Sequence, residues 1–526
     1  MRSIFLFSVM FLRSLISYAQ HSGEDVQDYR ISIRVSDTSD RIVVEEWVEV
    51  QLDAPSDSVF LDLASVTTNG KGMTVTEVRW EEASVPYTHQ NDLLTVPAPA
   101  GNTAALVHLR IFYNGIPEDG LIIGKNKYKQ RTFFGDNWPN RAHHWIACND
   151  HPSDKALYTF HVYAPEKYKV VSVGEFKGKE QVGNGSLMWT YRSSVPLPTK
   201  VAVIGIADMV WKEVETIDNA VLVTSAVYPQ NASRSLSDLA VAPQIVKFYA
   251  RLLGDYEFEK LMNVQSTTRY GGMENAGCIF YDENALNGKG TAEPLVAHEI
   301  AHQWFGNSVT ETGWEHLWLS EGFATYMTNV YLEEYFGTER FLEQMKMDRA
   351  LVASFLKKYD HPLVDTKQDD PNKMLNPNAY QKGSWVLHML RVKLGDSLFF
   401  QGLKDYYQAF RLGNADSDDL KSAFEISSGV DLGVFFENWL HKKGHPILKT
   451  LIDQSNGKKV FIVRQTQEEV FQFDLKVAFT LEDGTVRTEQ FQIHQREDQI
   501  ELPNFGKKVF SYKLDPEVEL LYEEIN

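Results

Sequence analysis

The chain has 526 residues, which is too long for one compact domain, and its 43% apolar and 23% charged residues exclude disordered, collagen-like and coiled-coil classes. Lys and Arg number 52 against 71 Asp and Glu, and the resulting net charge of -19 argues against nucleic acid as a partner. Two cysteines, Cys148 and Cys278, are too few for a disulfide scaffold or a Cys-rich zinc module. They leave open one long-range bridge or two free thiols.

Residues 1–19 are typical of a secretory signal peptide. Arg2 supplies the positive end, a mostly apolar run follows, and Ser17 and Ala19 are small residues at the spacing of a cleavage site. The apolar run is shorter than the ~20 residues of a membrane-spanning helix. We therefore expect cleavage after Ala19, a mature chain without a transmembrane segment, and a secreted or periplasmic protein.

The spacing of apolar residues divides the rest of the chain into three regions. Residues 20–233 alternate with period two, as in Val107, Leu109 and Ile111, which predicts an N-terminal antiparallel β domain. Helical spacing dominates residues 234–445, and period two returns in residues 446–526. The sequence thus predicts a multidomain α+β protein whose α-rich central domain is followed by a small β-sandwich.

The α-rich region contains the segment His298-Glu-Ile-Ala-His302. Side chains four positions apart share one face of a helix, so both imidazoles can bind one metal ion, for which zinc is the best candidate. Glu299 between them is the candidate general base. The alternative is an ordinary amphipathic helix that carries two histidines.

A zinc site needs a third protein ligand, and Glu321 follows His302 after 18 intervening residues. Apolar neighbours, among them Trp318 and Phe323, indicate that this carboxylate is buried and needs a cationic partner. The alternative is a first-turn Glu that interacts only with its own helix dipole. The prediction is one Zn2+ per chain, held by His298, His302 and Glu321.

Upstream lies Gly271-Gly-Met-Glu-Asn275, in which two glycines allow a close backbone approach and Glu274 offers a carboxylate. From these residues alone the motif is weak, and a Gly-Gly turn with a solvated Glu is the favoured interpretation.

Together, these motifs resemble the gluzincin zinc aminopeptidases, which are peptidase family M1, the aminopeptidase N-like enzymes. The similarity extends through residues 302–310 and 318–323, and it includes Ala379-Tyr-Gln-Lys-Gly383 and residues 141–152. The order of β, α-rich and β regions also fits that family.

The resemblance implies a thermolysin-like catalytic domain and removal of single residues from the free N-termini of peptides. It implies that Tyr380 stabilises the oxyanion and that Glu274 binds the substrate's ammonium group. Gly271, Gly272 and Met273, together with Asn275, would border the substrate. Asp136, five residues before Arg141, falls where the family has a second amine contact, although an Asp-Asn turn is the alternative there.

About 80 residues follow the α-rich region, whereas many family members continue into a C-terminal helical domain. We therefore expect a short form with a more open active site. Two other functions remain possible at this stage: a thermolysin-type zinc endopeptidase, and a non-catalytic peptide-binding protein. The side-chain preference and the oligomeric state are left open.

Overall fold

The computed structural model describes most of the chain beyond its N-terminal residues. The described residues are 23–52, 56–98, 106–183, 185–217, 221–368, 370–453 and 459–525. The predicted signal peptide, residues 1–19, lies outside them. Within the described part of the chain, no helix combines the length and the apolar character needed to cross a membrane.

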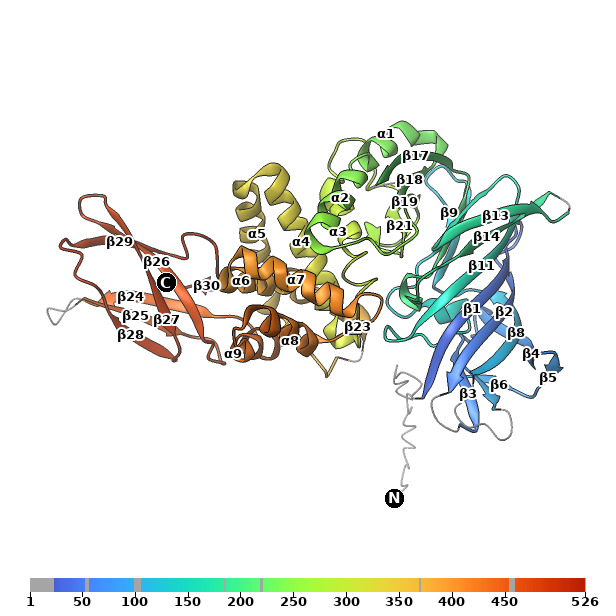
Figure 1. Ribbon diagram of the computed structural model, residues 1–526, viewed down its shortest axis with the longest axis horizontal. Coiled ribbons are helices and arrows are strands. Elements are labelled where there is room, and N and C mark those ends of the chain that lie inside the picture. Colours follow the sequence, from blue (N-terminus) through green and yellow to red (C-terminus); the bar gives the residue numbers. More distant parts are fainter. Residues whose placement is uncertain are drawn as a thin grey trace, which may run out of the picture.

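The N-terminal region is a β structure built around a nine-stranded sheet (Figure 1). Its strand β1 (Glu24–Arg34) pairs antiparallel with β2 (Ile42–Leu52). On its other side β1 pairs in parallel with β11 (Lys155–Pro165), so the predicted all-antiparallel pattern is wrong at this pair. The sheet is completed by β4 (Gly72–Trp80), β5 (Ala83–Ser84), β8 (Leu106–Ile116), β13 (Glu175–Gln181), β14 (Ser186–Arg192) and β15 (Leu197–Pro198).

Two smaller sheets complete this region. The first consists of β9 (Leu121–Lys125), β10 (Arg131–Gly135), β12 (Lys169–Ser172) and β16 (Ile204–Ala207). The second consists of β3 (Ser58–Asp62), β6 (Thr88–Gln90) and β7 (Leu93–Pro97).

The α-rich region begins with a five-stranded sheet that extends across the predicted boundary at residue 233. Its strands, in spatial order, are β17 (Val210–Ile217), β18 (Val221–Val227), β19 (Lys260–Ser266), β21 (Cys278–Asp282) and β20 (Gly272–Met273). The sequence placed β17 and β18 in the N-terminal β domain, but β18 pairs in parallel with β19. A period of two identifies a strand without identifying its sheet, which explains the difference.

Helices pack around this sheet and extend toward the C-terminus (Figure 1). They are α1 (Ala232–Leu239), α2 (Ala242–Leu253), α3 (Glu293–Ala301), α4 (Trp318–Phe336), α5 (Thr338–Leu356), α6 (Gly383–Leu394), α7 (Asp396–Phe410), α8 (Ser417–Ser428), α9 (Gly433–Phe436) and the π-helical turns η6 (Asn378–Lys382) and η7 (Glu437–His441).

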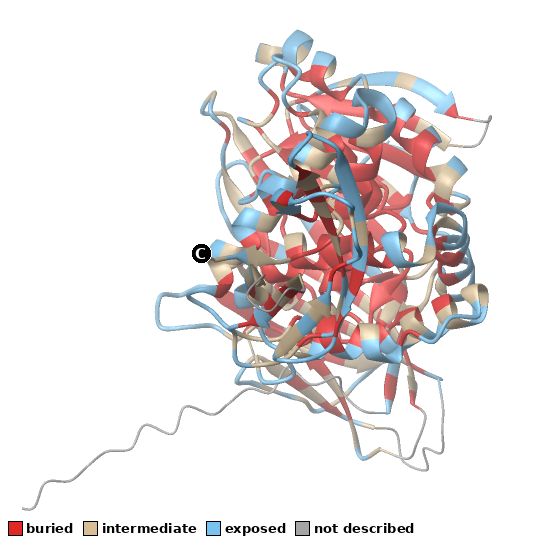
Figure 2. Ribbon diagram, turned by 90° about the vertical axis from the view of Figure 1, so that its left-hand side faces the viewer, coloured by how far each residue is buried: buried red, intermediate tan, exposed pale blue. Residues whose placement is uncertain are grey.

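The C-terminal region consists of two small sheets that share apolar contacts. One contains β24 (Ile447–Asp453), β25 (Val460–Gln465), β28 (Glu497–Glu501) and β30 (Glu523–Glu524), and the other β26 (Phe473–Leu481), β27 (Val486–Ile493) and β29 (Val509–Leu514). The rings of Phe461 and Phe479 meet between the sheets at 5.8 Å. Figure 2 shows the buried residues gathered inside the body, behind exposed loops.

Two lysines of the N-terminal region are inserted into the α-rich region. Lys155 Nζ donates to the carbonyl oxygens of Ser308 at 2.8 Å and Gly413 at 2.6 Å. Lys200 Nζ lies 2.5 Å from Glu311 Oε1, and the two side chains are only 1% and 0% exposed. A buried charge is tolerated only when it is paired, so each region here completes the other.

Candidate metal centre and substrate cavity

Helices α3 and α4 bring three predicted metal ligands to one point. Nε2 of His298 and Nε2 of His302 are 3.2 Å apart, and they lie 3.5 and 3.3 Å from Glu321 Oε2. Tetrahedral ligands at about 2.0–2.1 Å from zinc are about 3.3 Å from one another. The spacing of the three donor atoms therefore fits a single zinc ion, which these side chains would hold at the wall of the cavity.

Contacts behind His302 fix its orientation. Its Nδ1 lies 3.2 Å from the Phe305 carbonyl oxygen and 3.1 Å from Ser320 Oγ. A proton on Nδ1, donated to Phe305, leaves the lone pair of Nε2 for the metal. Burial would lower the pKa of His302, but the carboxylates of Glu321 and Glu274 raise it to about 9. These carboxylates would stabilise a divalent cation in the same way.

Glu299 faces the same cavity from the next position on α3, and it lies against Gly272 of β20. A Cβ atom at residue 272 would be 2.2 Å from Glu299 Oε1. The sequence explained this glycine by close approach of a substrate, whereas the structure shows that it makes room for the candidate base. Burial raises the pKa of Glu299 well above its ordinary value.

Glu274 presents a third carboxylate to the cavity, beside those of Glu299 and Glu321. Its carbonyl oxygen accepts hydrogen bonds from Gln303 Nε2 at 3.0 Å and Asn307 Nδ2 at 2.6 Å, which fix its backbone beside the metal ligands. Glu274 is 5% exposed, and its Oε1 has no hydrogen-bond partner among the described residues. Burial raises the pKa of this carboxyl. A cation in the cavity would give this buried oxygen the partner that it lacks.

Tyr380 reaches the metal centre from η6, and its ring stacks on that of His298 with centroids 6.1 Å apart. Two glycines allow this approach, because a Cβ atom at Gly322 on α4 would be 2.8 Å from the Cα atom of Gly383, where α6 begins. Burial raises the pKa of Tyr380, so its hydroxyl stays protonated and can donate a hydrogen bond.

These groups surround a cavity of about 210 Å³. It is lined by Trp138, Tyr270, Gly271, Gly272, Met273, Glu274, Leu295, His298, Glu299, His302, Glu321, Leu375 and Tyr380. Of the predicted substrate-binding residues, the structure thus brings Gly271, Gly272, Met273 and Glu274 to the cavity. Asn275 is fully buried and is not among the lining residues.

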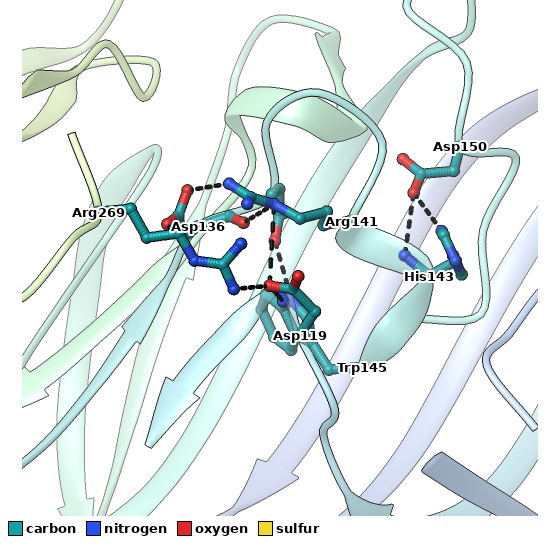
Figure 3. A network of polar contacts seen from close by, with 9 residues as sticks. Asp119, Asp136, Arg141, His143, Trp145, Asp150 and Arg269 are labelled. Atoms are coloured by element: carbon teal, nitrogen blue, oxygen red, sulfur yellow. Dashed lines mark hydrogen bonds and ion pairs between the residues drawn. The ribbon is translucent and has the colours of Figure 1, made fainter. Parts of the chain in front are cut away.

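Asp136 also lies outside the cavity wall, in a network of charges (Figure 3). Its Oδ1 accepts from Arg141 Nη2 at 2.6 Å, and its Oδ2 is 3.9 Å from Arg269 Nε. Two guanidinium groups, those of Arg141 and Arg269, thus face the Asp136 carboxylate. The contact of Asp136 with the substrate amine stays a prediction.

Some functional positions were missed by the sequence. Nothing in the sequence pattern assigned Ser320 a role, yet its Oγ lies 3.1 Å from His302 Nδ1. Its place directly before Glu321 was the only available signal. Gln303 and Asn307 lie in the segment that resembled the family, but their bonds to Glu274 depend on the fold. Cys148 and Cys278 are both buried, free thiols.

Comparisons with known proteins agree with this site. The Peptidase M1 N-terminal domain matches residues 26–201, and the Peptidase family M1 domain matches residues 238–439, which include all three predicted metal ligands.

Several curated proteins are similar to the chain. Probable aminopeptidase 1 of Saccharolobus solfataricus is 29% identical over 58% of this chain and 41% of its own length. Leucyl aminopeptidase of the same organism is 24% identical over 80% of this chain and 53% of its own length. Tricorn protease-interacting factor F2 of Thermoplasma acidophilum is 28% identical over 81% of this chain and 52% of its own length. The chain spans about half the length of these relatives. With both domain matches in their expected order, the chain belongs to peptidase family M1.

Proposed function

We propose that the protein is a zinc-dependent aminopeptidase that hydrolyses the N-terminal residue from peptides, with one zinc ion per chain. The observation that carries the proposal is one cavity with two distinct recognition elements. His298, His302 and Glu321 converge as candidate metal ligands, and Glu274 adds a carboxylate whose Oε1 has no hydrogen-bond partner among the described residues. The family membership and the aminopeptidase names of relatives support it.

Each side chain has a role in this reaction. Bound zinc supplies Lewis-acid activation of water and of the scissile carbonyl at neutral pH. The Glu299 carboxylate accepts a proton from the attacking water and passes it to the leaving amine. The Tyr380 hydroxyl donates a hydrogen bond to the developing oxyanion, a contribution of about 3–4 kcal/mol in other hydrolases.

Glu274 accounts for the choice of the first peptide bond. Its carboxylate pairs with the substrate's ammonium group and so limits how far a peptide enters the cavity. Glu321, which lines the same cavity, adds negative charge to the same area. The proposal includes a thermolysin-like catalytic unit, a C-terminal β-sandwich and export directed by residues 1–19, the last of which rests on sequence alone.

The test compares a leucyl fluorogenic substrate with its N-acetylated form, before and after removal of metal by a chelator. We expect cleavage of the free substrate only, loss of activity on chelation and recovery with zinc. Glu299→Gln should lower kcat by roughly 10²–10⁴-fold while zinc stays bound. Glu274→Gln should raise KM for the free substrate.

The other outcomes identify the alternatives. Equal cleavage of free and acetylated substrates would indicate a thermolysin-type endopeptidase. Peptide binding without turnover in the zinc-loaded protein would indicate a non-catalytic binding protein.

A further inference from the structure

Four alternating charges join the N-terminal β region to the loop that precedes Gly271 (Figure 3). Arg141 Nη2 donates to Asp136 Oδ1 at 2.6 Å, and Arg269 Nη2 donates to Asp119 Oδ1. Two longer contacts close the ring: Arg269 Nε lies 3.9 Å from Asp136 Oδ2, and Arg141 Nε lies 3.8 Å from Asp119 Oδ1. We call these four residues the arginine clamp.

The clamp is electrically balanced, with two carboxylates and two guanidinium groups. Asp136 is buried and Arg141 nearly so, which makes a missing partner costly. Burial raises the pKa of Asp136, although both arginines act to lower it. Arg141 also donates from Nε to the carbonyl oxygen of Asp136 at 3.1 Å, so Asp136 is held at both its backbone and its side chain.

Arg269 differs from the other three members because it belongs to the α-rich region. It lies in the loop between β19 and β20 and is 44% exposed. The next two residues, Tyr270 and Gly271, line the substrate cavity, and the chain then passes Gly272 to reach Glu274. Residues 269–271 are exposed, and only the end of this segment is held by the sheet, where the Gly271 carbonyl accepts from the Asp282 amide at 3.0 Å. An exposed segment is mobile where it is not anchored, so the side chain of Arg269 decides the order of the part before Gly271.

We propose that Arg269 is a positioning residue for amine recognition: held by Asp119 and Asp136, it fixes the loop whose continuation carries Glu274 into the cavity. This inference rests on the proposed aminopeptidase function. It also gives Asp136 a new role, as a partner of Arg269 and Arg141, in place of the direct substrate contact that the sequence resemblance implied.

The two roles of Asp136 predict opposite effects of removing Arg269. If Asp136 bound the substrate's ammonium group, Arg269 would compete with the substrate for its carboxylate, and loss of Arg269 would lower KM. If Asp136 serves the clamp, loss of Arg269 releases the loop and raises KM. The sign of the change separates the two roles.

The experiment uses Arg269→Gln and Asp119→Asn in the full-length protein, with Arg411→Gln as the matched control. Arg411 is 41% exposed and pairs with the carboxylate of Glu257 at 2.8 Å. Two readouts are measured: KM and kcat for the leucyl substrate, and hydrogen exchange of the backbone amides of residues 267–274.

For both clamp variants we expect KM to rise roughly fivefold or more, with kcat changed less than about threefold. Exchange should become faster in residues 267–274, and the Arg411→Gln control should match the parent in both readouts. The KM of the double variant should be no higher than that of either single variant, because both changes release the same loop. Arg269→Lys should raise KM less than Arg269→Gln does, since a lysine can still pair with Asp119.

A lowered or unchanged KM in Arg269→Gln, or unchanged exchange in residues 267–274, would overturn the inference. Because exchange does not depend on turnover, it keeps the two proposals apart. A parent protein without aminopeptidase activity would contradict the proposed function and, with it, the role in amine recognition. The exchange data would then still decide whether Arg269 anchors the loop.

Discussion

Glu299 and Gly272 touch across two elements of the site: the carboxylate of the candidate base on α3 occupies the space that any Cβ atom at residue 272 would need. The neighbouring residue 273 lines the cavity, and Glu274 offers its carboxylate one residue further on. One contact therefore sets the distance between the proton-accepting group and the strand that borders the substrate.

Replacing Gly272 by alanine should move Glu299 and lower kcat by about 10²-fold, because displacements near 1 Å have this effect on catalytic groups. Gly124→Ala is the control, since a Cβ atom there would meet nothing within 4 Å. Steady-state kinetics and zinc content check the prediction. Equal kcat values for the two variants would contradict it.

Ser320→Ala should weaken zinc binding, because it removes the Oγ atom that lies 3.1 Å from His302 Nδ1. Changes behind a metal ligand cost about 10–100-fold in affinity, and we expect the lower end because the Phe305 carbonyl remains. Competition with a chromophoric chelator measures the change. Thr328→Ala is the control on the same helix, since the Thr328 hydroxyl donates to the backbone carbonyl of Ala324 at 2.8 Å. Zinc affinity equal to that of the parent would disprove the role of Ser320.

Gly322→Ala should separate α4 from α6. The new methyl group would meet the Cα atom of Gly383 at 2.8 Å and the carbonyl oxygen of Ala379 at 3.1 Å, next to Tyr380. Such overpacking costs about 1–3 kcal/mol of unfolding free energy. We expect a lower thermal midpoint and a lower kcat together. Gly124→Ala, where a Cβ atom would meet nothing within 4 Å, should leave both unchanged.

The raised pKa of the buried Glu46 carboxyl predicts that the stability of the protein depends on pH. This fully buried side chain accepts hydrogen bonds from Tyr113 Oη at 2.6 Å and from the Ala147 amide at 3.0 Å, but burial outweighs them and raises its pKa to about 8. Between the ordinary pKa near 4.5 and this value, the unfolded chain loses a proton that the folded protein keeps. The free energy of unfolding should therefore fall as pH rises from about 5 to 8, and the loss should stop above about 8.

The variant Glu46→Gln isolates this effect. Its unfolding free energy relative to the parent should increase between pH 5 and pH 8, by up to a few kcal/mol, as measured by denaturant titration. Glu45→Gln, which removes a neighbouring carboxylate that pairs with Arg110 at 2.6 Å, serves as the control. A pH-independent difference between Glu46→Gln and the parent would contradict the raised pKa.

The sequence pointed to the candidate metal ligands more readily than to the residues that hold those ligands in place. His298 and His302 were predictable because four positions on one helix determine a shared face, and the buried context of Glu321 pointed to the third ligand. Ser320, Gln303 and the meeting of Gly322 with Gly383 were not, because each depends on how distant segments pack. A sequence pattern describes one element at a time.

The fold shows the same limit. Alternation identified strands throughout the N-terminal region, but it could not show that β17 and β18 join the sheet of the α-rich region. Nor could it show that β1 and β11 run in the same direction, since parallel and antiparallel neighbours share one side-chain period.

The ion pair between Lys200 and Glu311 has a consequence for attempts to divide the protein. A fragment that starts at β17 would retain Glu311 without its ammonium partner, and it would lose the Lys155 amine that binds the carbonyls of Ser308 and Gly413. During synthesis both lysines leave the ribosome before the segments they serve, so the first half of the chain can act as a template on which the second half closes.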